Sequence, residues 1–273
     1  MKWTQLIQKK VKLKFIVGLL LMVSVFSISN YLTISGKSDP VLLDEPLAVE
    51  HEQRQELEEN ENQSIVSEPE DKPGFYENVV TVANGDATLV LVNKNYALDP
   101  SYEPSDLVLP NVLTVGGNRN QTVYLREEAA FYLEQLFMAA HEEAGLEFLA
   151  RSGYRSYDTQ VALYQRYVSE NGQEAADRFS ARAGHSEHQT GLAIDVTADS
   201  VGGDLSILFG ETPEGIWLKE NAHRFGYIIR YLEGRESETG YQYEPWHIRY
   251  VGIEAAIEIY ENGWILEQYL EGQ

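Results

Sequence analysis

The chain has 273 residues, 43% of them hydrophobic and 11% aromatic, which is enough to build a sizeable globular core. Its formal net charge of −22 argues against a nucleic-acid partner, because such proteins present a basic surface to the phosphates. There is no cysteine, so disulfides, cysteine nucleophiles and thiolate metal sites are excluded. Any metal ion must therefore bind to His, Asp or Glu.

The N-terminus combines a basic tail with an apolar stretch. Five lysines lie within residues 1–14, and residues 15–36 carry no charge. An uncharged stretch of this length is close to the ~20 residues that cross a bilayer, and by the positive-inside rule the lysines keep the tail in the cytoplasm. We therefore expect a single-pass anchor in the cell membrane, with everything after Lys37 on the extracytoplasmic side.

Two alternatives to the anchor remain open. A cleaved signal peptide has the same basic and apolar regions, but only Ser27-Ile28-Ser29 offers small residues for a cleavage site. A helix buried in a globular core is disfavoured by the lysines ahead of it. Residues 37–74 are acidic and polar and bury too little apolar surface to fold, so they predict an extended, disordered tether.

Residues 75–273 predict one globular domain. Helices are expected over residues 126–144, ending at Gly145, and over residues 157–170, with Ser156 as the N-cap. A third helix starts at Pro213 and a closing helix at Ile253. Strands are expected over residues 88–92, 146–152, 192–196, 226–231 and 246–251. Because strands and helices do not strictly alternate, we expect an α+β fold, a mostly antiparallel sheet flanked by helices.

Two polar clusters beside predicted strands hold three of the six histidines. The first contains His185 and His188 on a loop and Asp195 in the strand that follows, with Gly191 allowing a turn between His188 and Asp195. The second contains Glu244 and His247 near the start of another strand. These last two are three residues apart and do not share a face of a regular strand, so the backbone near Pro245 must bring both toward one site.

Two imidazoles and one carboxylate are the ligands of an open zinc site, which leaves the fourth position to water and lowers the pKa of that water to roughly 7. A further carboxylate is then needed as general base, and Glu244 is the candidate. Taken singly, each of these residues is more often a capping or hydrogen-bonding group than a ligand or a base. Together, two histidines, an aspartate and a further glutamate favour a catalytic zinc site.

At this point the residues resemble a family. The pattern Ser186-x-His188-x-x-Gly191-x-Ala193-x-Asp195, followed by Glu244-x-Trp246-His247, resembles the D-alanyl-D-alanine carboxypeptidases of the VanY type, within the group that includes lysostaphin-like enzymes and hedgehog domains. The upstream block Ser152-Gly153-Tyr154-Arg155-Ser156, with Gln160 after it, resembles a third block of that family. The resemblance covers about residues 89–260.

The resemblance implies a role for each matching residue. Zinc would bind to His188, Asp195 and His247, with Glu244 as general base. Arg155 would polarise the scissile carbonyl and stabilise the oxyanion, although by itself it reads as one half of an ordinary ion pair. Ser186 and Gln160 would hold the end of the substrate, and Tyr154 could line the groove. His185 adjoins the motif without matching a ligand position, and we expect it to shape the loop.

The resemblance implies a zinc-dependent D-Ala-D-Ala carboxypeptidase, which would release the terminal D-alanine of peptidoglycan stem peptides. An L,D-carboxypeptidase acting on the tetrapeptide stem is the alternative, since both kinds share these blocks. A non-catalytic zinc module is the rival from another class, and the presence of Glu244 and Arg155 argues against it. An endopeptidase would need a groove open at both ends. We expect a monomer.

Overall fold

The computed structural model describes residues 74–116 and 121–272. The expected basic tail and membrane segment lie outside this part, as does the tether apart from Gly74. Among the described residues, no helix is both long and apolar enough to cross a membrane.

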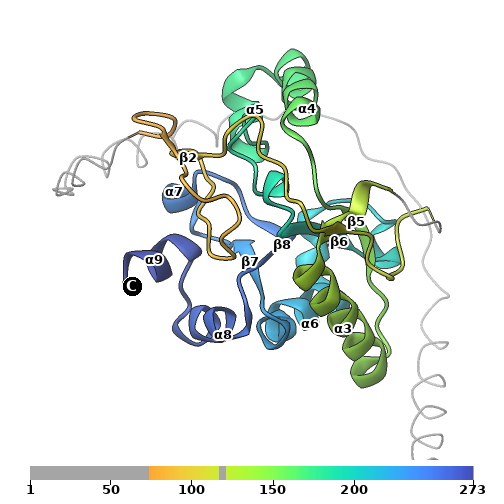
Figure 1. The fold of residues 1–273 in the computed structure, drawn as a ribbon. Coiled ribbons are helices and arrows are strands. Elements are labelled where there is room, and N and C mark those ends of the chain that lie inside the picture. Colours follow the sequence, from red (N-terminus) through yellow and green to blue (C-terminus); the bar gives the residue numbers. More distant parts are fainter. Residues whose placement is uncertain (1–73, 117–120, 273) are drawn as a thin grey trace, which may run out of the picture. The chain divides into compact units, whose positions relative to one another are not determined.

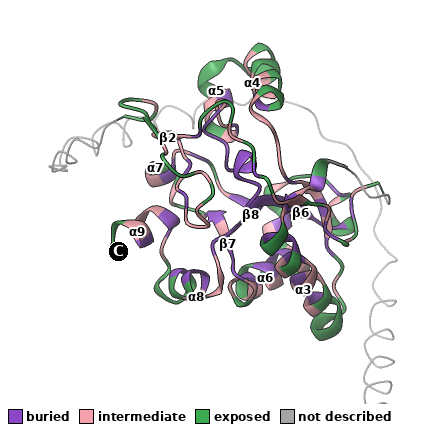
Figure 2. Ribbon diagram, in the orientation of Figure 1, coloured by how far each residue is buried: buried purple, intermediate pink, exposed green. Residues whose placement is uncertain are grey.

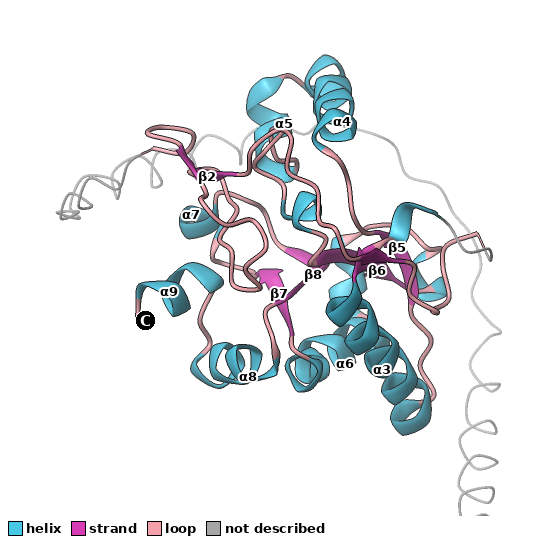
Figure 3. Cartoon of the chain, in the orientation of Figure 1, coloured by secondary structure: helices cyan, strands magenta, loops and turns pink. Residues whose placement is uncertain are grey.

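A four-stranded antiparallel sheet forms the centre of the domain, as the sequence predicts (Figure 3). Its strand order is β5-β6-β8-β7. The strands are β5 (Leu149–Ser152), β6 (Ala193–Thr197), β8 (Glu244–Tyr250) and β7 (Tyr227–Tyr231). Because β8 lies between β6 and β7, the last strand of the chain sits inside the sheet, paired on both sides.

Helices cover both faces of this sheet, with α3, α6 and α8 on one side and α4 and α5 on the other (Figure 1). The helices are α3 (Glu127–Ala144), α4 (Tyr157–Asn171), α5 (Gln173–Phe179), α6 (Pro213–Asn221), α7 (Glu236–Thr239), α8 (Ile253–Asn262) and α9 (Leu266–Glu271). The expected helix ends are confirmed: Gly145 caps α3 with φ 69°, and the Ser156 side chain accepts from the Thr159 amide at the start of α4.

The two faces of the sheet have different chemistry. Ile194, Val196 and Ile248 are buried in the main core, together with apolar side chains of α3 and α6 (Figure 2). Successive side chains of a strand point to opposite faces, so Asp195 and His247, which lie between these apolar positions, point the other way. The core face fixes the sheet, and the opposite face presents polar groups beneath α4 and α5.

The strand expected over residues 88–92 is wrong. Val90 and Val92 are buried, but the carbonyls of Thr88 and Val90 accept hydrogen bonds from Arg249 Nη2, at 3.0 and 2.8 Å. The Arg249 side chain thus supplies the hydrogen bonds to these carbonyls that a neighbouring strand would otherwise supply. Short two-residue pairs form elsewhere: β1 (Val80–Thr81) pairs in parallel with β2 (Tyr96–Ala97), and β3 (Leu107–Val108) pairs antiparallel with β4 (Leu125–Arg126).

Candidate active site

A short 3-10 helix, η2 (Glu187–Thr190), carries His188 to the polar face of the sheet. Gly191 ends it in the left-handed region, at φ 66°, and a Cβ there would meet Leu107 and Arg126 at 2.9 and 3.0 Å. The carbonyl of Gly153, just after β5, accepts from His188 Nδ1 at 2.8 Å. That contact leaves Nε2 as the nitrogen that faces the site.

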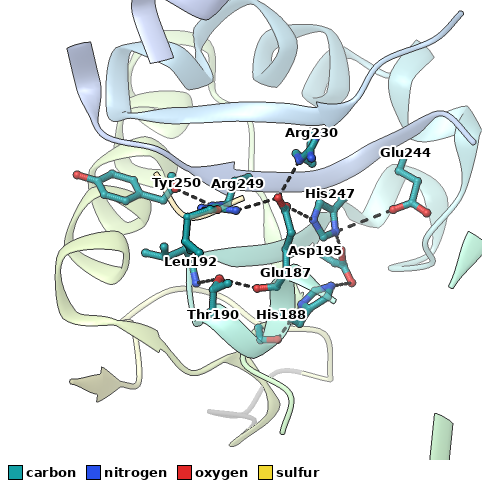
Figure 4. Close-up of polar contacts among 12 residues, drawn as sticks. Glu187, His188, Thr190, Leu192, Asp195, Arg230, Glu244, His247, Arg249 and Tyr250 are labelled. Atoms are coloured by element: carbon teal, nitrogen blue, oxygen red, sulfur yellow. Dashed lines mark hydrogen bonds and ion pairs between the residues drawn. The ribbon is translucent and has the colours of Figure 1, made fainter. Parts of the chain in front are cut away.

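Strand register places Asp195 and His247 side by side. They are direct partners in the antiparallel pairing of β6 with β8, and Ser152 of β5 is opposite Asp195 on its other side. His247 Nδ1 lies 3.1 Å from Asp195 Oδ1, and His188 Nε2 lies 3.5 Å from Asp195 Oδ2 (Figure 4). Side chains 52 residues apart in the sequence therefore meet because their strands pair.

A register shift explains how Glu244 and His247 reach the same site. Between Ile229 and Tyr231, a step of two residues on β7 corresponds to a step from Ile248 to Glu244 on β8. The extra residues on β8 interrupt its regular alternation, as a bulge does. Glu244 Oε2 consequently lies 3.9 Å from His247 Nδ1, although the spacing of the two residues is wrong for a regular strand.

The positions of His188, Asp195 and His247 fit a zinc ion. One ligand atom from each lies within 4.8 Å of the others, and all three residues are buried. Both histidines approach the Asp195 carboxylate closely: His247 Nδ1 lies 3.1 Å from Oδ1, and His188 Nε2 lies 3.5 Å from Oδ2. Two nitrogens and one oxygen are a donor set that zinc accepts, with one position left open for substrate or water.

Electrostatics at these residues also favour a cation. Burial acts against ionisation of Asp195, yet the neighbouring histidines outweigh it and hold its pKa well below the usual value. Burial lowers the pKa of His188. It acts the same way on His247, but hydrogen bonds to Asp195 and Glu187 outweigh it and raise the pKa of His247 to about 9. A proton and a metal ion therefore compete for His247, so metal affinity falls at low pH.

Glu244 has the environment of an acid–base group. Burial raises its pKa to about 8, with Asp195 adding to the effect and the charges of His247 and Arg155 opposing it. A carboxyl group whose pKa lies near neutrality can accept and return a proton in one reaction cycle. A dication beside it would favour the ionised form, which is the state a general base requires.

Arg155 follows the end of β5 and is held by Gln160. Its Nη1 donates to Gln160 Oε1 at 2.7 Å, while Gln160 Nε2 donates to the Ala181 carbonyl at 2.6 Å. The Arg155 amide donates to the His188 carbonyl at 3.2 Å. Both the oxygen and the nitrogen of the Gln160 side chain are therefore hydrogen-bonded within the protein, and Gln160 holds the Arg155 guanidinium.

All the expected site residues line one cavity of about 800 Å³. Ser186 is buried in its wall and Tyr154 is half-buried there. Further side chains of the wall include Arg151, Leu163, Tyr167, Tyr231, Tyr241 and Trp246. His185 is turned away from it: its Nδ1 lies 2.8 Å from the Asn93 carbonyl and its ring meets Tyr76 edge-on, which agrees with a loop-shaping part.

Glu187 is a site residue that the sequence analysis missed. It stands between Ser186 and His188, is 1% exposed, and places Oε2 3.3 Å from His247 Nε2. In the sequence it is one glutamate among many in a polar loop. Only the ion pairs with Arg230 of β7 and Arg249 of β8 show that this carboxylate is buried and paired.

Comparison with known proteins agrees with this geometry. Residues 122–253 match the family model described as VanY, D-alanyl-D-alanine carboxypeptidase. The protein YodJ of Bacillus subtilis is 48% identical over 191 residues, 70% of each chain. The bifunctional D-Ala-D-Ala dipeptidase and D-Ala-D-Ala carboxypeptidase VanXYC of Enterococcus gallinarum is 36% identical over 184 residues, 67% of this chain and 93% of that one.

Two solved structures are similar in fold as well as in sequence. The LdcB LD-carboxypeptidase is 47% identical with a TM-score of 0.68, covering 71% of this chain and 91% of its own. A variant of the vancomycin-resistance D,D-pentapeptidase VanY, in complex with Zn(II), is 35% identical with a TM-score of 0.56, covering 67% and 98%. Because the family model matches residues 122–253, which contain all the candidate site residues, and because the chain covers more than two thirds of relatives that are 36% and 48% identical to it, the chain belongs to the VanY family of D-alanyl-D-alanine carboxypeptidases.

Proposed function

We propose that this protein is a zinc-dependent carboxypeptidase that hydrolyses the bond before the terminal D-alanine of peptidoglycan stem peptides. The observation that carries the proposal is the meeting of His188, Asp195 and His247 with Glu244 and Arg155 in one cavity. A purely structural zinc site needs neither the buried acid nor the held guanidinium.

Each residue of the site has a different role in the proposed hydrolysis. Zinc held by the three ligands supplies Lewis-acid polarisation and a water of lowered pKa. Glu244 takes a proton from the attacking water and returns it to the amine of the departing D-alanine as the peptide bond breaks. Arg155 donates to the carbonyl oxygen as negative charge develops on it, an interaction that strengthens in the transition state. Ser186 and Tyr154 lie in the cavity wall, where the substrate's end would contact them.

The D,D bond of a pentapeptide stem is the main candidate, and the L,D bond of a tetrapeptide stem is the second. The higher similarity to the LdcB LD-carboxypeptidase supports the second, while the family model and the enterococcal relatives support the first. Mass spectrometry of purified penta- and tetrapeptides, incubated with the domain and Zn²⁺, tests both. Loss of one alanine that chelation abolishes is expected. If neither peptide is shortened, or turnover survives exhaustive chelation, the proposal fails.

The same proposal places the catalytic domain outside the cytoplasm as a monomer, anchored by residues 15–36 and carried on the tether of residues 37–74. The lysines ahead of the uncharged stretch support it, because they are retained on the cytoplasmic side. Mature peptidoglycan lies outside the cytoplasmic membrane, which fits this location.

A further inference from the structure

We propose that Glu187 is a positioning residue for the metal centre: its carboxylate holds His247 with Nε2 protonated and Nδ1 turned toward the metal. Arg230 and Arg249 in turn hold the carboxylate. The inference rests on the proposed zinc site and adds to it a residue that fixes one ligand.

The two oxygens of Glu187 have different partners. Oε1 accepts from Arg230 Nε at 2.7 Å and from Arg249 Nη1 at 2.8 Å, and all three side chains are fully buried (Figure 4). Oε2 lies 3.3 Å from His247 Nε2. Two guanidinium donors on one oxygen keep the carboxylate from rotating, so the other oxygen stays aimed at the imidazole.

The charges of this cluster balance without His247. Arg230 donates to Glu267 of α9 with Nη1 and Nη2, at 2.9 and 2.6 Å, and to Glu187 with Nε. The two arginines and two glutamates therefore sum to zero. A neutral imidazole that donates Nε2–H to Glu187 and leaves the Nδ1 lone pair free is the form that a metal requires.

A packing role alone does not explain the arrangement. Arg249 also binds the carbonyls of Thr88 and Val90, which secures the segment before β2. For that purpose Glu187 would need only Oε1. The backbone supports the second contact as well: Thr190 Oγ1 donates to the Glu187 carbonyl at 2.5 Å, which tightens the turn of η2 that aims both Glu187 and His188.

Glu187→Gln and Glu267→Gln form a matched pair for the test. Each removes one carboxylate charge from Arg230, and Glu187 in addition contacts Arg249 and His247. Competition with a chromophoric chelator measures zinc affinity. We expect E187Q to raise the zinc Kd about 10–100-fold, the usual effect of losing a partner of a metal-bound histidine, while E267Q stays within about twofold of wild type. The visible spectrum of the Co²⁺-substituted protein should change in E187Q and not in E267Q.

An unchanged Kd in folded E187Q, or equal losses in the two variants, would overturn the inference. Because E187Q could fail to fold, histidine ¹⁵N NMR of the zinc-loaded wild-type protein gives an independent test. His247 should carry its proton on Nε2 and bind metal through Nδ1, while His188 shows the reverse tautomer. Metal on Nε2 of His247 contradicts the inference. Absence of zinc binding in wild type would instead overturn the proposed function, and the inference with it.

Discussion

At the scale of single residues, a substitution of Glu244 should reduce catalysis without affecting metal binding. Its carboxylate lies beside His247 but is not one of the three ligands that the geometry brings together. We expect Glu244→Gln to lose about 10²–10⁴-fold in kcat, the usual contribution of a general base, with zinc content close to wild type. Metal analysis and steady-state kinetics measure both, and the exposed Glu220→Gln serves as control. Release of zinc from E244Q would show that Glu244 is a ligand.

Arg155 should affect the transition state more than substrate binding. Its guanidinium is held by Gln160, so it is already oriented before the substrate arrives. Arg155→Ala is expected to lower kcat about 10²–10³-fold while zinc content and melting temperature stay near wild type. Gln160→Ala should produce a smaller loss of the same kind. A rise in KM at unchanged kcat would assign Arg155 to substrate binding instead.

The raised pKa of Glu244 predicts a pH effect on the metal-free protein. Burial raises this pKa from 4.5 to about 8. Between pH 4.5 and pH 8 the Glu244 carboxyl is therefore protonated in the folded protein and ionised in the unfolded chain. The stability it contributes is complete below pH 4.5 and is lost as the pH rises toward 8. Wild type should therefore lose melting temperature relative to E244Q across that range, by at least about 2 °C. A constant difference between the two proteins would contradict the raised pKa.

At the scale of elements, the junction after β5 joins the sheet to the metal ligand. Gly153 provides the carbonyl that orients His188, and a Cβ on it would lie 2.4 Å from the Tyr124 carbonyl oxygen. Gly153→Ala must push these backbones apart, which typically costs about 1–3 kcal/mol. We expect a lower melting temperature together with weaker zinc binding.

Gly145→Ala is the matched control for this change. Gly145 has φ +69° and open space around the missing Cβ, so alanine there adds only backbone strain at the end of α3. Its melting temperature should fall while its zinc Kd stays at the wild-type value. If the two variants lose zinc affinity equally, the effect of Gly153→Ala is general destabilisation, and the junction after β5 does not specifically orient the metal ligand His188.

At the scale of the whole molecule, the proposed anchor predicts the topology of the protein in the cell. Protease added to intact protoplasts should digest the domain of residues 75–273 and leave a fragment that contains residues 15–36 in the membrane. A cleaved signal peptide predicts a domain that is released from the membrane fraction. A domain that is protected from protease in intact protoplasts, and digested only after lysis, would refute an extracytoplasmic location.

The sequence by itself determined the chemistry of the site and much of the local structure. The ligand types and the acid follow from residue identity, the role of Arg155 followed only from the family resemblance, and the ends of α3 and α4 follow from Gly145 and Ser156, since these are local signals. The tertiary structure decided what depends on strand pairing: Asp195 opposite His247, the register shift that admits Glu244, and the burial of Glu187. Strand register and burial are set by contacts between distant segments, which local pattern does not contain.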